Sequence, residues 1–337
     1  MRKIKIGING FGRIGRVAAR IILKRANLEL VAINSRADST SHAYLLQHDT
    51  TYGLFSERVI ADKGNLEVGG KVINVFQEKE PSQIAWDSAG VDVVIESTGI
   101  FRDKISASAH LDAGVKLVVI SAPPKDDIPT FCIGVNDKLL DINKFKIISN
   151  ASCTTNCLAT VAKVLEENYG IVKGFMTTVH SYTDSQNLLD NSHSKDFRLA
   201  RSAPYNMIPS STGASKALGL VLPSLKGKII SSSLRVPLNT VSIIDLTVII
   251  KKETDLKQIN NAFEKAAKSE LSGILDLSYD YLVSSDIKGS TFSSVVDGSL
   301  TVVSGNMVNV KAWYDNEWGY TSRLIDLVEK AASDLIK

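Results

Sequence analysis

The chain lacks long apolar segments and carries no strong excess of charge. No stretch approaches the roughly 18 uncharged apolar residues that a membrane-spanning helix needs. Lys and Arg number 39 against 36 for Asp and Glu, and no long basic run is present, which argues against nucleic-acid or membrane partners. The N-terminus leads into a strand pattern rather than the apolar core of a signal peptide, so we expect a cytoplasmic protein.

Cysteine and histidine are also scarce, with three and five copies. Cys132, Cys153 and Cys157 cannot all pair and show no repeated CxxC spacing, so we expect a reduced compartment and no bound metal. Hydrophobic residues make up 44% of the chain and charged residues 22%, near the averages for globular proteins. At 337 residues the chain exceeds what one hydrophobic core usually organises, which predicts two domains of roughly 150 residues each.

A glycine-rich motif follows the first predicted strand. Residues 3–9 alternate as a strand does, GFGRIG follows at 10–15, and residues 16–23 and 28–34 indicate a helix and a second strand. In such a βαβ unit the glycines permit a tight turn and the close approach of a pyrophosphate to the helix N-terminus. A glycine-rich turn without a ligand is the alternative. The context favours a dinucleotide-binding fold.

Two further apolar runs extend this prediction. Residues 91–96 and 116–121 are near-continuous in apolar character, as central parallel strands are, and residues 105–113 indicate a helix between them. Both runs end in small polar residues, where α/β sheets bind ligands.

The end of the second strand departs from the usual NAD pattern. Asn34, Ser35 and Arg36 stand where an acidic residue commonly binds the adenosine ribose. A carboxylate would repel a 2′-phosphate, whereas a hydroxyl and a guanidinium could bind one. The alternative is that Ser35 still bonds the ribose, Arg36 is solvated, and NAD binds less tightly.

One cysteine stands between a predicted strand at 146–151 and a predicted helix at 158–165. Cys153 therefore falls at a helix N-terminus, where the helix dipole and unpaired backbone N–H groups lower a thiol pKa. The same N–H groups could form an oxyanion hole. We expect Cys157, one helical turn further on, to be a packing residue, and Cys132, in the strand-like segment 130–134, to be a core residue.

A thiolate needs a base, and His180 ends a strand-like segment at 175–180. At a strand end an imidazole can pair with a thiol and later take a proton from a substrate hydroxyl. A lone histidine is more often structural, and that is the role expected of His42, His48, His110 and His193. Hydroxyl and basic residues that could form two anion pockets follow: Thr183, Arg198, Arg201, Thr212, Gly213, Lys216 and Arg235.

Six motifs resemble, in order, signatures of the glyceraldehyde-3-phosphate dehydrogenase family. They are INGFGRIGR (8–16), SNASCTTNC (149–157), TTVH (177–180), STGA (211–214), LRVP (234–237) and WYDNEWGY (313–320). The resemblance implies an N-terminal Rossmann-type, doubly wound parallel sheet at 1–151, completed by a C-terminal helix at 317–337. It also implies an α+β catalytic domain with a mixed or antiparallel sheet at 152–316, and a homotetramer.

The resemblance implies a role for each matched position. Cys153 would be the nucleophile and His180 the base and later the acid, while Thr183 and Arg235 would hold the C3 phosphate of the substrate. The residues implied for inorganic phosphate are Ser152, Thr154, Arg198, Thr212 and Gly213. From the glycine motif and the resemblance together, the predicted cofactor-binding residues are Gly10, Gly12, Arg13, Ile14, Ser35, Arg36, Lys79, Ser121, Ser192 and Asn316.

The implied reaction oxidises glyceraldehyde 3-phosphate with NAD(P) and inorganic phosphate to 1,3-bisphosphoglycerate, in glycolysis or gluconeogenesis. Cys153 would carry a thiohemiacetal and then a thioester, with His180 and the thiolate coupled as an ion pair. Segments 180–183 and 189–193 resemble NADP-accepting chloroplast-type members, so we expect NADP to be used as well as NAD. The alternatives are erythrose-4-phosphate dehydrogenase, a semialdehyde dehydrogenase, and a non-catalytic dinucleotide-binding redox sensor.

Overall fold

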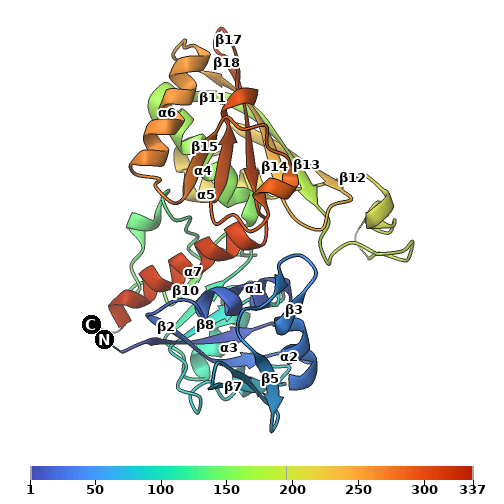
Figure 1. Cartoon of the computed structure of the whole chain (residues 1–337). Coiled ribbons are helices and arrows are strands. Elements are labelled where there is room, and N and C mark those ends of the chain that lie inside the picture. The colour runs from blue at the N-terminus through green and yellow to red at the C-terminus, as the bar shows by residue number, and fades with distance from the viewer. Residues whose placement is uncertain (1, 195, 336–337) are drawn as a thin grey trace. The chain divides into compact units, whose positions relative to one another are not determined.

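A computed structural model describes residues 2–194 and 196–335, which form two compact units. The first unit contains the chain up to Phe131, Asp137–Ala151 and the residues from Thr321 onward. The second contains Cys132–Asn136 and Ser152–Tyr320. Each unit has its own eight-stranded sheet, which confirms the predicted two-part α/β architecture (Figure 1).

The sheet of the first unit has the order β10-β9-β8-β1-β2-β7-β6-β5. All pairs from β10 to β7 are parallel, and β6 and β5 add an antiparallel edge. The six parallel strands follow the order of the dinucleotide-binding fold, which reverses between β1 and β8. The strands are β1 (Ile4–Asn9), β2 (Leu28–Asn34), β5 (Val59–Asp62), β6 (Asn65–Val68), β7 (Lys71–Phe76), β8 (Val93–Glu96), β9 (Leu117–Ile120) and β10 (Ile147–Ser149).

Three neighbouring strands of this sheet are buried along their whole length. Every residue of β8, β9 and β10 is buried, as expected for a parallel sheet covered on both faces. A small hairpin, β3 (His48–Asp49) with β4 (Gly53–Leu54), stands apart. The helices are α1 (Arg13–Ile22), α2 (Ser39–Gln47) and α3 (Lys104–Asp112).

The sheet of the second unit is mixed, with the order β12-β13-β11-β14-β18-β16-β15, and β17 pairs with β18. β11 pairs parallel with β13 and antiparallel with β14. The strands are β11 (Ile171–Ser181), β12 (Ile208–Ser210), β13 (Ile229–Val236), β14 (Ser242–Ile250), β15 (Leu275–Ser278), β16 (Ser294–Asp297), β17 (Val302–Ser304) and β18 (Met307–Tyr314).

One face of this mixed sheet is covered by a long helix. α4 (Cys153–Tyr169) packs on β14, β16 and β18, and β14 alternates between buried and half-buried residues along its length. This alternation is typical of a sheet with one face in the core. The other helices are α5 (Ala214–Val221), α6 (Leu256–Lys268) and α7 (Trp318–Ala332).

Two details differ from the sequence-based prediction. Cys132 is buried as predicted, but segment 130–134 is not a strand: Thr130 forms an isolated parallel bridge with Ser149, and a turn follows at 133–136, where the N–H groups of Val135 and Asn136 donate to the Cys132 carbonyl. The predicted C-terminal helix ends earlier, at Ala332, with a short 3-10 turn at Ser333–Leu335, and its last two positions, 336–337, lie outside the described residues. No helix of the described part of the chain is long and apolar enough to cross a bilayer.

Candidate active site

Cys153 is the first residue of α4. The helix is capped by Ser152, whose Oγ accepts a hydrogen bond from the backbone N–H of Thr155 at 3.1 Å. Directly before the cap, Ala151 has a φ of 56°, in the left-handed region that a side chain disfavours. Such backbone strain concentrates at functional sites. The chain therefore accepts an unfavourable conformation to turn directly from β10 into the helix that begins with Cys153.

His180 faces this cysteine from the carboxyl end of β11. Its Nε2 lies 3.4 Å from the Cys153 Sγ, and the imidazole is buried. In the parallel pair of β11 and β13, His180 is opposite Arg235. The Arg235 Nη1 lies 2.6 Å from the His180 Nδ1. The structure thus brings together the predicted nucleophile, the predicted base and one predicted phosphate-binding residue.

The two contacts of the His180 Nδ1 need opposite tautomers. The atom lies 2.7 Å from the Ser181 carbonyl, which only accepts, and 2.6 Å from the Arg235 guanidinium, which only donates. If Nδ1 carries the proton, Nε2 can accept the proton of the Cys153 thiol. If Nδ1 accepts from Arg235, Nε2–H points at the sulfur and suits a thiolate. The imidazole can therefore form a hydrogen bond with the sulfur whether Cys153 is a thiol or a thiolate.

Burial controls the charge of this pair in the ligand-free chain. Burial raises the pKa of the Cys153 thiol, although the Arg235 charge acts in the opposite direction. Burial and the Arg235 charge lower the pKa of His180 to about 3. The predicted lowering of the Cys153 pKa and the predicted ion pair are therefore wrong for the ligand-free protein. Both shifts favour a thiol and a neutral imidazole, because burial disfavours the charged form of each group.

Tyr314, at the end of β18, is a site residue that the sequence reasoning missed. Its buried hydroxyl lies 2.8 Å from the Oγ1 of Thr154 and 2.8 Å from the Oγ1 of Thr178. Its ring meets the His180 imidazole edge to face, at 6.0 Å between centroids. The signal was available, because alternation along β18 puts Tyr314 on the buried face with Ala312. Burial raises the pKa of this phenol, so it stays protonated.

The remaining predicted phosphate residues lie on loops around β11, β12 and β13. Thr183 follows the end of β11, and its Oγ1 lies 2.9 Å from the Ser185 hydroxyl. Thr212 and Gly213 join β12 to α5, where the Thr212 Oγ1 accepts from the Ala214 N–H at 3.2 Å. Arg198 is exposed in the loop after β11. Among all the predicted phosphate-binding residues, only Thr154 and Arg235 contact the Cys153–His180 pair directly within the described part of the chain.

The glycine-rich turn of the first unit has the geometry that its motif predicts. Gly10 has a φ of +94°, and a Cβ there would lie 2.7 Å from the Thr98 nitrogen. A Cβ at Gly15 would lie 2.1 Å from the Gly10 carbonyl oxygen, so only glycine lets α1 approach β1 this closely. A Cβ at Gly12, the N-cap of α1, would meet nothing within 4 Å. Open space therefore lies beside the helix N-terminus, where a pyrophosphate would bind.

The other predicted cofactor residues lie on both units. Arg13 and Ile14 open α1, and Arg13 is ion-paired with Asp49. Ser35 is half-buried after β2, Ser121 is half-buried after β9, and Arg36, Lys79 and Ser192 are exposed. Asn316, in the second unit, accepts from the hydroxyls of Ser181 and Ser242 at 2.9 and 3.2 Å through its Oδ1. Those two bonds orient the amide, so that its NH₂ group is the part able to donate to a ligand.

Comparisons with known proteins agree with both halves of the chain. Residues 4–104 match the family model described as glyceraldehyde 3-phosphate dehydrogenase, NAD binding domain, and residues 152–316 match the C-terminal domain of the same enzyme. The glyceraldehyde-3-phosphate dehydrogenase of Priestia megaterium is 49% identical over 331 residues, which cover 98% of each chain. The chloroplastic glyceraldehyde-3-phosphate dehydrogenase A of Chlamydomonas reinhardtii is 49% identical over 98% of this chain and 89% of its own. This chain therefore belongs to the glyceraldehyde-3-phosphate dehydrogenase family, and is an oxidoreductase acting on aldehyde groups.

Proposed function

We propose that this enzyme is a phosphorylating glyceraldehyde-3-phosphate dehydrogenase in which Cys153 is the nucleophile and His180 moves the protons. The observation that supports it best is the 3.4 Å contact between the Cys153 Sγ and the His180 Nε2 at the start of α4. A thiol, an adjacent base and helix N–H groups are the set that acyl transfer through a thioester requires. The first domain, 1–151 with helix 317–337, would bind the dinucleotide, and the second, 152–316, would perform the chemistry.

The chemical steps follow from this contact. Cys153 loses its proton to His180 and adds to the aldehyde carbon, which forms a thiohemiacetal. His180 returns this proton to the aldehyde oxygen, and it then takes the proton of the resulting thiohemiacetal hydroxyl as the carbon–hydrogen bond breaks. Asn316 would hold the carboxamide of a bound nicotinamide, which would supply the hydride acceptor. Inorganic phosphate displaces the Cys153 sulfur from the thioester, so that an acyl phosphate leaves and the thiolate returns.

The contact between Arg235 and His180 links substrate binding to the pKa of His180. Its guanidinium lies 2.6 Å from the His180 Nδ1 and contributes to the low pKa of that imidazole. A substrate phosphate bound to Arg235 would balance the positive charge, and the pKa of His180 would rise towards neutrality. His180 would then be a stronger base with a phosphorylated substrate in place than in the ligand-free chain, although the effect of its burial would remain. Thr183 would bind the same phosphate from the loop after β11.

We propose that the enzyme accepts NADP as well as NAD, through Ser35, Arg36, Lys79 and Ser192. Ser35 and the exposed cations Arg36 and Lys79 follow the ends of β2 and β7, adjacent strands of the first sheet. A 2′-phosphate would meet a hydroxyl and positive charge there, without a carboxylate directly after β2. If kcat/KM for NADP is more than about a hundredfold below that for NAD, this part of the proposal fails.

We also propose a cytoplasmic homotetramer. Phe175 on β11 and Ile230 on β13 are paired in register on the sheet face away from the α4 side, and both are exposed. The loop between β11 and β12 exposes further large apolar side chains: Leu188, Leu189, Phe197, Tyr205 and Met207. A second copy of the chain is the occupant that would bury them. Cell fractionation with an antibody to the chain tests the compartment.

A single assay tests the catalytic proposal. Purified enzyme is given glyceraldehyde 3-phosphate with NAD or NADP, with and without inorganic phosphate, and the nicotinamide absorbance is followed. We expect steady turnover only with phosphate present. Cys153→Ser should abolish it and still bind NAD, whereas Cys157→Ala, which changes a buried thiol one helical turn away, should remain active. A wild type with no turnover on any phosphorylated aldose would instead favour a redox sensor.

Erythrose-4-phosphate dehydrogenase is the second candidate. Such an enzyme hydrolyses its thioester and does not need a site for inorganic phosphate. The Thr212 hydroxyl beside Gly213, in the loop that joins β12 to α5, is predicted to hold inorganic phosphate and therefore favours the phosphorylating reaction. A steady rate that does not depend on added phosphate would reverse this choice.

A further inference from the structure

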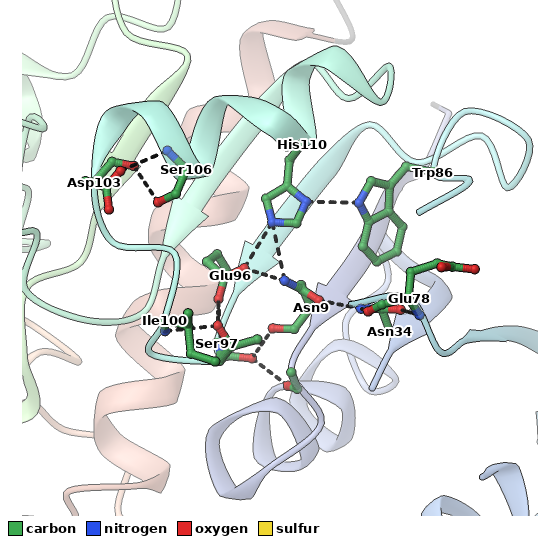
Figure 2. Close-up of polar contacts among 12 residues, drawn as sticks. Asn9, Asn34, Glu78, Trp86, Glu96, Ser97, Ile100, Asp103, Ser106 and His110 are labelled. Carbon is green, nitrogen blue, oxygen red and sulfur yellow. Dashed lines mark hydrogen bonds and ion pairs between the residues drawn. The ribbon is translucent and has the colours of Figure 1, made fainter. Parts of the chain in front are cut away.

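A buried carboxylate lies at the ligand-binding edge of the first sheet (Figure 2). Glu96 is the last residue of β8 and is 1% exposed. β8 lies beside β1, at the point where the strand order reverses, which is where α/β sheets bind ligands. Burying a charge is costly unless hydrogen bonds compensate it. The groups that donate hydrogen bonds to Glu96 also connect it to the predicted cofactor site.

Four donors converge on the Glu96 carboxylate. Oε2 accepts from the Asn9 Nδ2 at 2.5 Å and from the His110 Nε2 at 3.0 Å. Oε1 accepts from the backbone N–H of Thr98 at 2.8 Å and from the Thr98 hydroxyl. An ionised carboxylate accepts at both oxygens, and no other form of this side chain can receive all four bonds.

His110, on α3, is held in one tautomer by Trp86. The indole Nε1–H, which can only donate, lies 3.1 Å from the His110 Nδ1. Nδ1 is therefore an acceptor, and Nε2 carries the hydrogen that points at Glu96. Asn9 Nδ2 also lies 3.4 Å from that Nε2, but both atoms are donors here, so this contact is not a hydrogen bond. The carboxylate thus faces a neutral imidazole, and Nε2 remains the donor as long as Trp86 donates to Nδ1.

From Glu96 the hydrogen bonds run to the end of β2. Because the Asn9 NH₂ donates to Glu96, its Oδ1 is left to accept from the Asn34 Nδ2, at 2.8 Å. The Asn34 Oδ1 then accepts from the Glu78 N–H at 2.9 Å, and its NH₂ donates to the Glu78 carbonyl at 3.0 Å. Asn34 and Glu78 directly precede Ser35 and Lys79, which are proposed to bind the adenosine end of the dinucleotide.

A second branch reaches the glycine-rich turn. The Ser97 hydroxyl donates to the carbonyls of Asn9 and Gly10 at 3.1 and 2.7 Å. Gly10 in turn approaches the backbone of Ser97 and Thr98 so closely that a Cβ would lie within 3 Å of it. The glycine-rich turn, where a pyrophosphate would bind, and the segment after β2, where the ribose would bind, are therefore both hydrogen-bonded to residues that surround Glu96.

We propose that Glu96 is a positioning residue for the dinucleotide, with His110 as its fixed donor. The ionised carboxylate sets the orientation of the Asn9 and Asn34 amides, and through them the spacing between the Gly10 turn and the segments that begin at Ser35 and Lys79. Glu96 acts through these residues and does not touch the cofactor. This inference rests on the proposed dinucleotide function, and it gives a positioning role to Glu96 and His110, which are not among the predicted cofactor-binding residues.

Glutamine at this position tests the role of the charge at nearly constant volume. Its amide has one acceptor and one donor end, while donors face both carboxylate oxygens. An NH₂ towards Thr98 would oppose a backbone N–H that cannot turn. An NH₂ towards Asn9 would oppose the His110 Nε2–H or force the Asn9 amide to flip, which breaks its bond to Asn34. In either orientation one segment of the cofactor site loses its hydrogen bond.

The experiment measures the Kd of NAD for ligand-free wild type, Glu96→Gln and Asp92→Asn. Asp92 is the matched control, because it is a buried carboxylate directly before β8, at the opposite end, where it accepts from Arg2, Lys5 and Lys116. Glu96→Gln should raise the Kd by about tenfold and leave kcat at saturating NAD within about twofold. Asp92→Asn should lower Tm and leave the Kd within about twofold. Alkylation of Cys153 by iodoacetamide should proceed at the wild-type rate in both.

A second pair of variants covers the case in which Glu96→Gln does not fold. In His110→Gln the amide oxygen can accept from Trp86 and its NH₂ can donate to Glu96, whereas His110→Leu can do neither. We expect a near-wild-type Kd for the glutamine variant and a Kd about fivefold higher for the leucine variant.

Three results would overturn this inference while leaving the proposed function intact. They are unchanged or tighter NAD binding in Glu96→Gln, equal weakening in Asp92→Asn, and equal Kd values for His110→Gln and His110→Leu. Tighter binding would mean that removing a negative charge near an anionic ligand outweighs the loss of order. A wild type that neither binds nor reduces NAD would instead refute the proposed function, and this inference with it.

Discussion

His180 combines a proton-transfer position with a pKa far from that of a free imidazole. Its pKa of about 3 in the folded chain compares with about 6.5 in an unfolded one. Between these values the unfolded chain binds a proton that the folded chain does not, so this residue destabilises the fold progressively as pH falls below about 6.5. At neutral pH His180 is uncharged in both the folded and the unfolded chain, so it no longer lowers the stability of the fold.

This difference predicts an acid-dependent loss of stability. Between pH 7 and pH 5 the wild type should lose about 1–2 kcal/mol more unfolding free energy than His180→Gln, because glutamine takes up no proton. Urea unfolding of both proteins at the two pH values gives the comparison, in which titration of all other groups cancels. Equal losses in the two proteins would show that the imidazole is protonated in the folded state.

Arg235 and His180 make a second residue-scale prediction. Replacing Arg235 by Gln removes the charge that lowers the pKa of His180 and also lowers that of Cys153. The pKa of both groups should therefore rise in the variant. The imidazole resonances of His180, titrated by NMR, and the pH profile of Cys153 alkylation measure the two changes. A downward move of either would contradict the contact geometry.

The glycines of the turn should respond differently to the same added methyl group. Gly15→Ala places a Cβ 2.1 Å from a backbone oxygen and should cost about 1–3 kcal/mol of stability. Gly12→Ala meets no atom within 4 Å, so its Tm should stay within about 2 °C of wild type. Because that methyl group occupies the space at the N-terminus of α1, it should still weaken NAD binding by about tenfold. Thermal melts with and without NAD separate the two effects.

At the scale of single elements, the start of α4 links stability to chemistry. The Ser152 hydroxyl caps the helix that begins with Cys153, just as Asp255 caps α6 by accepting from the Gln258 N–H at 2.8 Å. An N-cap replaced by Ala costs about 1 kcal/mol. The two helices carry comparable caps, but only one of them carries the nucleophile.

Removal of each cap should therefore have the same effect on stability and different effects on rate. Ser152→Ala and Asp255→Ala should each lose about 1 kcal/mol. Only Ser152→Ala should lower kcat, by about tenfold at saturating phosphate, since a small displacement of the nucleophile slows the reaction steeply. An equal kcat in both variants would mean that Cys153 is positioned without help from the cap.

At the scale of the whole molecule, the mixed sheet exposes apolar side chains at which the proposed tetramer would bring copies of the chain together. Phe175 and Ile230 lie side by side there and are 49% and 65% exposed. Replacing both with Glu should reduce the assembly from four chains to fewer, because opposed copies would then bring like charges together. Sedimentation velocity of the double variant and the wild type tests this, with Val72→Glu, an exposed change on β7 of the first sheet, as the control. A wild type that sediments as a single chain would refute the tetramer.

The sequence alone determined the fold and the identity of the chemical groups. Period-2 and continuous apolar runs predicted β1, β2, β8 and β9, and the glycine motif placed the turn after β1, because these signals depend on local backbone geometry. Cys153 and His180 followed from their positions at a helix start and a strand end. The same local reasoning predicted a strand at 130–134, where only Thr130 bridges to Ser149 and a turn follows at 133–136, since apolar alternation does not distinguish a buried loop from a strand.

Only the tertiary structure decided how those groups behave. Tyr314 reaches Thr154 from more than 150 positions along the chain, and Glu96 gathers four donors from three segments, which contain Asn9, Thr98 and His110. The charge state of Cys153 also depended on burial, which raises the pKa of the thiol although the Arg235 charge lowers it. Hydrogen bonding and desolvation depend on what surrounds a side chain in space, and that information is absent from its neighbours in sequence.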